Sequence, residues 1–97
     1  MESTVVRVHT YRVESENLPE FLTRRAAVID LIRADNPGLV STRLVRVEDG
    51  SFLDTWSWKS MEAMTAAFPL ARSPEAALAW SLATASSAMN GEVIDER

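Results

Sequence analysis

The chain has 97 residues, of which 46% are hydrophobic, and a formal net charge of −4. This length suffices for one domain over residues 1–97 but only for a marginal core, so we expect a homodimer. The negative charge argues against nucleic acid or an anionic membrane as a partner. The absence of cysteine excludes thiolate sites, and the single histidine excludes a multi-histidine metal site within one chain. No apolar run is long enough for a membrane span or a signal peptide, which favours a cytoplasmic location.

A first strand is predicted at residues 4–13, because β-branched and aromatic side chains predominate there. We interpret Arg7 as an ordinary polar residue of this strand, and Arg43 as one of the next strand. Neither face is purely apolar, so we expect both faces of the sheet to be covered in part. Alternation places on one face Val5, Arg7, His9, Tyr11 and Val13.

A helix is predicted at residues 18–35, with Asn17 as its N-cap and Pro19 in its first turn. Arg25 lies in the middle of the apolar stripe of this helix, where a charge is unusual. The run Asn36-Pro37-Gly38 ends the helix. The stripe itself consists of Leu18, Phe21, Leu22, Val28, Ile29 and Ile32.

Residues 39–48 and 52–60 are predicted to form a β-hairpin, joined by the turn signal Glu48-Asp49-Gly50. Two indoles and a carboxylate fall on one face of its second strand, which is unusual for plain core. We therefore expect a functional site on this face, which carries Phe52, Asp54, Trp56 and Trp58.

Two further helices are predicted, at residues 60–68 and at about 73–87, each beginning at a serine N-cap. The second is alanine-rich, and Trp80 points away from its apolar stripe, so we expect Trp80 at a subunit contact. A last edge strand is predicted at residues 92–96. The resulting order of elements predicts an α+β, ferredoxin-like fold of the split-βαβ type. The stripe of the second helix is formed by Leu78, Leu82, Ala85 and Met89.

With these elements in place, the chain resembles the antibiotic biosynthesis monooxygenase (ABM) family of dimeric α+β barrels over nearly its whole length. The resemblance rests on the element order, on Asn36-Pro37-Gly38-Leu39, and on the junction Trp58-Lys59-Ser60 with Met61-Glu62-Ala63 after it. It implies that the sheets of two subunits face each other and that a ligand cavity lies between each sheet and its helices. It also implies that Trp58 borders this cavity.

The resemblance also bears on activity. Quinone-forming members of the family use an Asn four residues before the tryptophan, where this chain has Asp54, and an ionised Asp cannot donate a hydrogen bond as Asn does. Haem-degrading members have an Asn on the first strand, where His9 stands here, and an axial His on the last long helix. That region of this chain reads Ala76, Ala77 and Leu78 and holds no His, so we expect no haem. With one histidine, no cysteine and no glycine-rich phosphate loop, we also expect no metal and no other cofactor.

Three residues are candidates for catalysis. His9 titrates near neutral pH and would act as a base, with Asp54 of the neighbouring strand orienting its imidazole; alternatively, His9 is a partly exposed strand residue or lines the dimer contact. Arg25 would stabilise a substrate anion; alternatively, its stem packs on the sheet and its head pairs with Asp54 or reaches water. Candidate substrate-binding residues, which would otherwise be plain core, are Trp56, Trp58, Met64 and Phe68.

Together these features predict a small cofactor-independent monooxygenase that oxidises an aromatic or polyketide-like phenol through its anion and O2. Two alternatives remain open. One is an isomerase, cyclase or dehydratase that uses the same enolate chemistry without oxygen. The other is a non-enzymatic ligand-binding or stress-response domain of the same fold.

Overall fold

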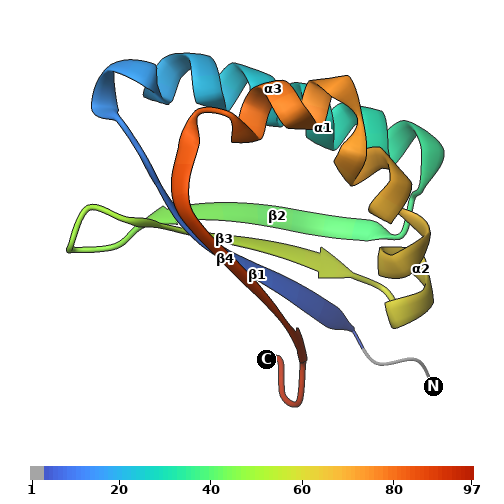
Figure 1. Ribbon diagram of the computed structural model, residues 1–97. Coiled ribbons are helices and arrows are strands. Elements are labelled where there is room, and N and C mark those ends of the chain that lie inside the picture. The colour runs from blue at the N-terminus through green and yellow to red at the C-terminus, as the bar shows by residue number, and fades with distance from the viewer. Residues whose placement is uncertain (1–3) are drawn as a thin grey trace.

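The computed structural model describes residues 4–97, which form a four-stranded antiparallel sheet with helices on one face (Figure 1). The strand order is β2-β3-β1-β4, so the two strands that are central in space are the first and the third in sequence. The predicted ferredoxin-like α+β fold is confirmed. The elements are β1 (Val5–Val13), α1 (Leu18–Asp35), β2 (Leu39–Arg46), β3 (Phe52–Trp58), α2 (Met61–Ala66), α3 (Pro74–Trp80) and β4 (Ala83–Glu92), with 3₁₀ turns at Ser15–Asn17 and Phe68–Arg72.

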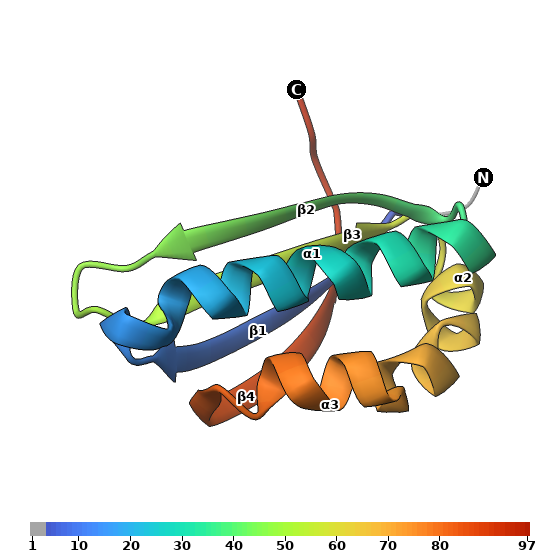
Figure 2. The same cartoon turned by 90° about the horizontal axis from the view of Figure 1, so that it is seen from above.

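Helices α1 and α3 run side by side over the sheet, and α2 lies near one end of it (Figure 2). Among residues 4–97, no helix lies on the opposite face of the sheet (Figure 1). Within this described part of the chain, therefore, helices cover only one of the two sheet faces that we expected to be covered. No helix within residues 4–97 is long and apolar enough to cross a membrane.

Helix α1 begins and ends where the sequence predicts. Pro19 lies in its first turn, and Asn36 follows with extended backbone. The predicted apolar stripe is buried at Phe21, Val28, Ile29 and Ile32. Leu22 is an exception, because 44% of it is exposed. Asn17 occupies the N-cap position as predicted, but its side chain makes no capping hydrogen bond.

The turn after α1 is tightly packed against α2. A Cβ added at Gly38 would lie 2.6 Å from the Cβ of Ala63, so only glycine fits there without a shift of its neighbours. The Asn36 side chain spans the same gap by donating to the Ala63 carbonyl at 2.7 Å. The backbone N–H of Lys59 donates to the Gly38 carbonyl at 2.9 Å. These contacts fix the end of β3, and with it Trp58.

The hairpin and both serine caps form as predicted. β2 pairs with β3 through a turn in which Gly50 has a φ of +89°, a conformation that favours glycine. Alternate residues of β3 are buried, starting from Phe52. The hydroxyl of Ser60 accepts from the Ala63 N–H, and that of Ser73 accepts from the Ala76 N–H.

The predicted helix over residues 73–87 and the last strand at 92–96 are wrong. α3 ends at Trp80, and β4 then pairs with β1 along most of its length. Alanine has a high helix propensity, but propensity is a weak preference that the hydrogen bonds of a sheet edge override. Consequently the expected stripe does not form, and Leu78 and Met89 are 52% and 68% exposed.

Strand β4 contains an irregularity near its start. Thr10 pairs with Ser87 and Arg12 with Thr84, so β4 has one residue more than β1 between these pairs. Within this bulge Ala85 has a φ of +54°, the left-handed region that alanine rarely adopts. Ser86 of this bulge and Ser87 directly after it contribute to the cavity described next.

Candidate functional site

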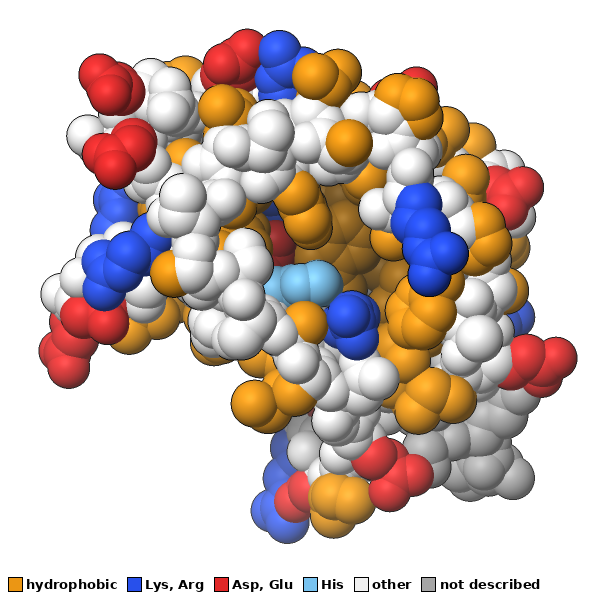
Figure 3. Space-filling view, in the orientation of Figure 1, with side chains coloured by type: hydrophobic (Ala, Val, Ile, Leu, Met, Phe, Trp, Pro, Cys, Tyr) orange, Lys and Arg blue, Asp and Glu red, His pale blue; other side chains and the backbone are white. Residues whose placement is uncertain are grey.

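A cavity of about 370 Å³ lies between the helix-covered face of the sheet and the segment from α2 to α3. Its wall is largely apolar and aromatic. In the space-filling view it is a hollow with the histidine at its base and hydrophobic side chains around it (Figure 3). The residues that line it include His9, Trp56, Trp58, Met64, Phe68 and Trp80.

His9 contributes the imidazole of this cavity. It projects from β1 between two indoles, with ring centroids 6.5 Å from Trp56 and 6.4 Å from Trp80. Burial lowers its pKa below 6.5, and the charges of Arg7 and Arg25 lower it further, whereas the charge of Asp54 opposes them. The imidazole is therefore neutral at neutral pH and can accept a proton.

Arg7 supplies positive charge at the same cavity. Its Nη1 donates to Asn90 Oδ1 at 2.8 Å, and its guanidinium carbon lies 5.5 Å from the centre of the Phe68 ring. No carboxylate within the described residues pairs with it. We interpreted Arg7 as an ordinary polar residue of the first strand, but its side chain lines the cavity.

Trp58 lines the cavity and carries a buried hydrogen-bond donor without a partner in the described part of the chain. The residue is only 4% exposed, yet its Nε1–H has no acceptor among residues 4–97. A buried donor without a partner carries a free-energy cost of about 1–3 kcal/mol. An acceptor atom that reached this N–H would remove that cost.

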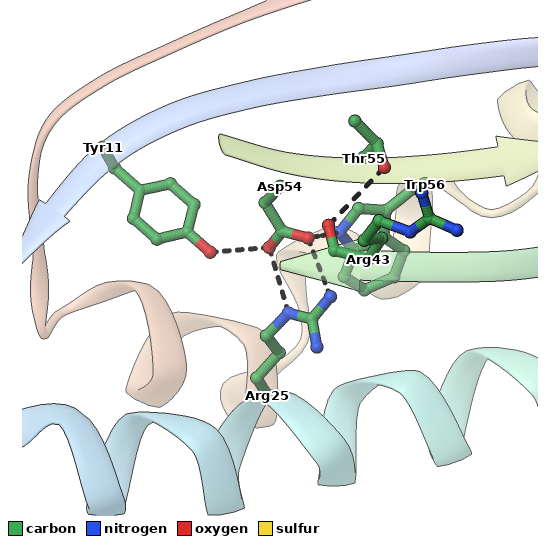
Figure 4. A network of polar contacts seen from close by, with 6 residues as sticks. All are labelled: Tyr11, Arg25, Arg43, Asp54, Thr55 and Trp56. Carbon is green, nitrogen blue, oxygen red and sulfur yellow. Dashed lines mark hydrogen bonds and ion pairs between the residues drawn. The ribbon is translucent and has the colours of Figure 1, made fainter. Parts of the chain in front are cut away.

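Asp54 lies behind the cavity wall in a closed polar network (Figure 4). It is 0% exposed and accepts hydrogen bonds from three side chains. The Tyr11 hydroxyl donates at 2.6 Å, the Trp56 Nε1–H at 2.9 Å, and Arg25 donates twice, at 3.0 Å from Nε and 2.8 Å from Nη2. Both carboxylate oxygens are therefore occupied.

The network also shifts the pKa values of its other members. Burial raises the pKa of the Tyr11 phenol, and the hydrogen bond to Asp54 raises it further. Burial alone would lower the pKa of Arg25, but its hydrogen bonds and ion pair with Asp54 raise it overall. Tyr11 therefore stays protonated and Arg25 stays charged at neutral pH, and neither is a proton carrier.

The structure places at the cavity five of the seven candidate residues that the sequence predicts: His9, Trp56, Trp58, Met64 and Phe68. The expectation that Asp54 and Arg25 also converge there is wrong, because neither lines the cavity and they bind each other instead. His9 and Asp54 are cross-strand partners in register, as expected. No hydrogen bond joins their side chains within the described residues, because the oxygens of Asp54 are turned to other donors.

Sequence reasoning missed three residues that matter here. Arg7 and Tyr11 share the predicted face of His9, and that alternation was the available signal. Trp80 was expected at a subunit contact. Its ring instead lies 6.1 Å from that of Tyr11, 5.5 Å from that of Phe21 and 6.4 Å from that of Trp56, so it closes the aromatic wall.

No protein-family model and no curated protein matches the chain. Solved structures do. A variant of SnoaB, a cofactor-independent oxygenase from Streptomyces nogalater, has 22% identity and a TM-score of 0.76, over 97% of this chain and 96% of that one. A candidate antibiotic biosynthesis monooxygenase from Caulobacter crescentus has 17% identity and a TM-score of 0.71, over 97% and 92%.

A third similar structure is MhuD, a haem degrader from Mycobacterium tuberculosis with two haems bound in its active site. It has 25% identity and a TM-score of 0.66, over 96% of this chain and 98% of that one. These proteins share one architecture but differ in chemistry, so the similarity establishes the fold and leaves the reaction to the site. The resemblance expected from the sequence is confirmed at this level: the chain has the fold of the ABM-like proteins.

Proposed function

We propose that this protein is a small cofactor-independent monooxygenase that oxidises an aromatic or polyketide-like phenol. The observation that carries the proposal is the neutral imidazole of His9 in an aromatic cavity that also holds Arg7 and the free N–H of Trp58. A base, a cation and a hydrogen-bond donor around one apolar space are what the formation of a substrate anion requires.

In the proposed reaction, His9 accepts the O–H proton of a phenol or the acidic C–H proton of its keto tautomer. Arg7 and the Trp58 N–H stabilise the oxyanion that is left. The anion gives one electron to O2, and the substrate radical and superoxide recombine into a carbon–oxygen bond. Protonated His9 returns its proton to the distal peroxide oxygen. Loss of water then leaves a quinone, so one oxygen atom enters the product, the other leaves as water, and the substrate supplies every electron.

The dimensions and polarity of the cavity support a flat, mostly apolar substrate. Its volume of about 370 Å³ lies near the lower end of the range for small-molecule sites, about 300–1,000 Å³. Trp56, Trp58 and Trp80 offer broad ring surfaces, and Met64 adapts to irregular shapes. An apolar wall also excludes water, which protects the radical pair and strengthens the field of Arg7.

The residues present do not fit haem. The only imidazole of the chain stands on the sheet, between the rings of Trp56 and Trp80. The helical side of the cavity presents no imidazole, and its lining includes Met64, Ala67, Ala71 and Ala76. We therefore derive no step through haem.

A second candidate reaction is isomerisation, cyclisation or dehydration through the same enolate, without oxygen. It is favoured by Asp54, which stands where the resemblance implies an Asn in quinone-forming members. That carboxylate is fully occupied by Tyr11, Arg25 and Trp56. It has no free donor for a peroxide or an oxyanion, so oxygen chemistry here would have to depend on His9, Arg7 and Trp58 alone.

The test uses anthrone, a tricyclic ketone whose enol is a phenol and whose oxidation by O2 gives anthraquinone and water. We expect one O2 consumed per anthraquinone formed, and a kcat/KM that rises with pH with a midpoint below 6.5, because only neutral His9 is a base. His9→Ala should lower kcat/KM by about 100-fold or more. The measurement is oxygen uptake with product quantified in parallel.

Arg33→Gln serves as the matched control, because Arg33 is exposed on α1 and lies outside the cavity. A His9→Ala variant as active as the wild type would remove the proposed base. Turnover of an enolisable substrate without oxygen uptake would favour the isomerase alternative. A ligand that binds and is recovered unchanged would favour the non-enzymatic one.

A further inference from the structure

Asp54 and His9 stand directly opposite each other on neighbouring strands, on the same face of the sheet. In such a pair the side chains leave the backbone about 4.5–5.5 Å apart. His9 faces the cavity, whereas Asp54 is buried behind Trp56. The carboxylate is thus close to the imidazole but separated from any ligand.

Trp56 links the two. Its Nε1–H donates to Asp54 Oδ1 at 2.9 Å, and its ring meets the His9 imidazole edge-on. The guanidinium carbon of Arg25 lies 5.7 Å from the centre of the Trp56 ring, on the way to its paired contact with Asp54. The carboxylate, the guanidinium and the indole therefore hold one another in a single arrangement beneath the cavity.

We propose that Asp54, balanced by Arg25, is a positioning residue: it fixes the Trp56 indole as a wall of the His9 site and sets the charge that His9 experiences from below. It is not a catalytic residue, because it touches no part of the cavity and its oxygens are already bonded. The inference rests on the proposed role of His9 as the base, and deepens it by assigning the residues that maintain this base.

The charges around His9 are few, which makes the inference testable. Within the described residues, β1 contributes Arg7, β3 contributes Asp54, and α1 contributes Arg25. The neighbours from α3 and β4 are Trp80 and Ala88, and both are uncharged. Asp54 favours the protonated imidazole, and the two arginines oppose it.

The experiment follows the titration of His9 by NMR in the ligand-free 97-residue protein. Because the chain has one histidine, its imidazole signals need no assignment and no turnover is required. In Arg25→Gln the positive charge is removed, so the titration midpoint should rise. In Asp54→Asn the negative charge is removed and Arg25 remains, so the midpoint should fall. The double variant should lie between the two.

The opposite signs separate this role from a purely structural one. If either substitution merely loosened the core, water would enter the cavity and the midpoint would rise towards 6.5 in both variants, because burial is the main cause that lowers it. A rise in Asp54→Asn, or no movement in it, would overturn the proposal. Each single substitution leaves the other member of this ion pair unpaired, so Asp54→Asn is also compared with the double variant, in which neither charge remains and the midpoint should be higher than in Asp54→Asn.

The matched control is Arg24→Gln. Arg24 is the neighbour of Arg25 on α1, and the substitution removes its exposed ion pair with Glu20. Its effect on the His9 titration should be negligible, because solvent screens exposed charges. The outcome is also independent of the proposed reaction. If the His9 titration shifts as expected but no tested substrate consumes oxygen, the oxygenase proposal is wrong and the positioning role stands. If oxygen is consumed but the His9 titration does not shift as expected, the positioning role is wrong and the oxygenase proposal stands.

Discussion

At the scale of one residue, Trp58 shows a feature that lowers the stability of the fold and fits the proposed ligand site. Its indole is held by the end of β3, which the Lys59–Gly38 backbone bond fixes. The N–H is buried without an acceptor among the described residues. Trp56, two residues earlier on the same face, has the same side chain with its N–H satisfied by Asp54. The two tryptophans therefore form a natural matched pair.

We expect Trp58→Phe and Trp56→Phe to differ in both stability and binding. Trp56→Phe breaks a buried hydrogen bond, so it should lower the free energy of unfolding by about 1–3 kcal/mol more than Trp58→Phe does. Trp58→Phe should instead weaken binding of 1-naphthol by up to about tenfold, the value of one hydrogen bond. Chemical denaturation and anaerobic titration calorimetry measure the two effects.

Equal destabilisation by both substitutions would show that the Trp58 N–H finds an acceptor in solution. Unchanged naphthol affinity in Trp58→Phe would show that the ligand oxygen lies elsewhere in the cavity. Either result would remove Trp58 from the proposed oxyanion contacts and leave Arg7 as the one positive group there.

At the scale of elements, the bulge in β4 determines how this strand meets the cavity. One extra residue between the Thr10 and Arg12 pairs changes the direction of the side chains that follow. Ser86, within the bulge, and Ser87, directly after it, both contribute to the cavity lining. The bulge is achieved with Ala85 in a left-handed conformation, where a Cβ is unfavourable.

We therefore expect Ala85→Gly to stabilise the protein by about 0.5–1 kcal/mol. The left-handed conformation costs alanine about 1–2 kcal/mol, and glycine returns part of that gain through its larger loss of backbone entropy, about 0.5–1 kcal/mol. Ala88→Gly, in the same strand at a regular position opposite His9, should destabilise by about 0.5–1 kcal/mol. Denaturant titration of both variants tests the sign, and a destabilising Ala85→Gly would contradict the left-handed bulge.

At the scale of the whole molecule, the bare face of the sheet favours the homodimer that we propose. Its apolar residues include Val8 on β1, Leu53 on β3 and Met89 on β4. Two copies joined by these faces would cover both sheets and give each its second layer.

We expect sedimentation at micromolar concentration to give about twice the chain mass of 10.8 kDa. Val8→Lys should shift the protein to monomer, because it places a charge at the centre of the proposed interface. The exposed Arg33→Gln should not. A wild-type monomer at that concentration would contradict the proposed dimer, while the fold of the single chain would stand.

Local signals account for what the sequence predicts well. Pro19 and the run Asn36-Pro37-Gly38 delimit α1, and strict alternation defines the buried face of β3. β4 escapes prediction because its partner β1 is distant in sequence and its alanines and serines have no strand signal of their own. Long-range pairing decided its structure, and local propensity did not.

The difference between local signals and long-range contacts also explains which site residues the sequence predicts. Alternation shows which residues share a sheet face, and so it identifies His9, Trp56 and Trp58. It does not show which part of that face a helix covers. Asp54 lies where Arg25 of α1 reaches down to the sheet, so its side chain is enclosed, whereas the cavity opens elsewhere on the same face.

All three tryptophans of the chain and its only histidine border the one aromatic cavity. Indole emission depends on what surrounds the ring, and here each emitting ring is a wall of the same space. A molecule that enters would change the entire intrinsic fluorescence of the protein, without a silent tryptophan elsewhere to dilute the signal. Ligand binding to the unlabelled protein can therefore be followed by its tryptophan fluorescence. Collections of phenols and enols can be screened in this way before any reaction product is known.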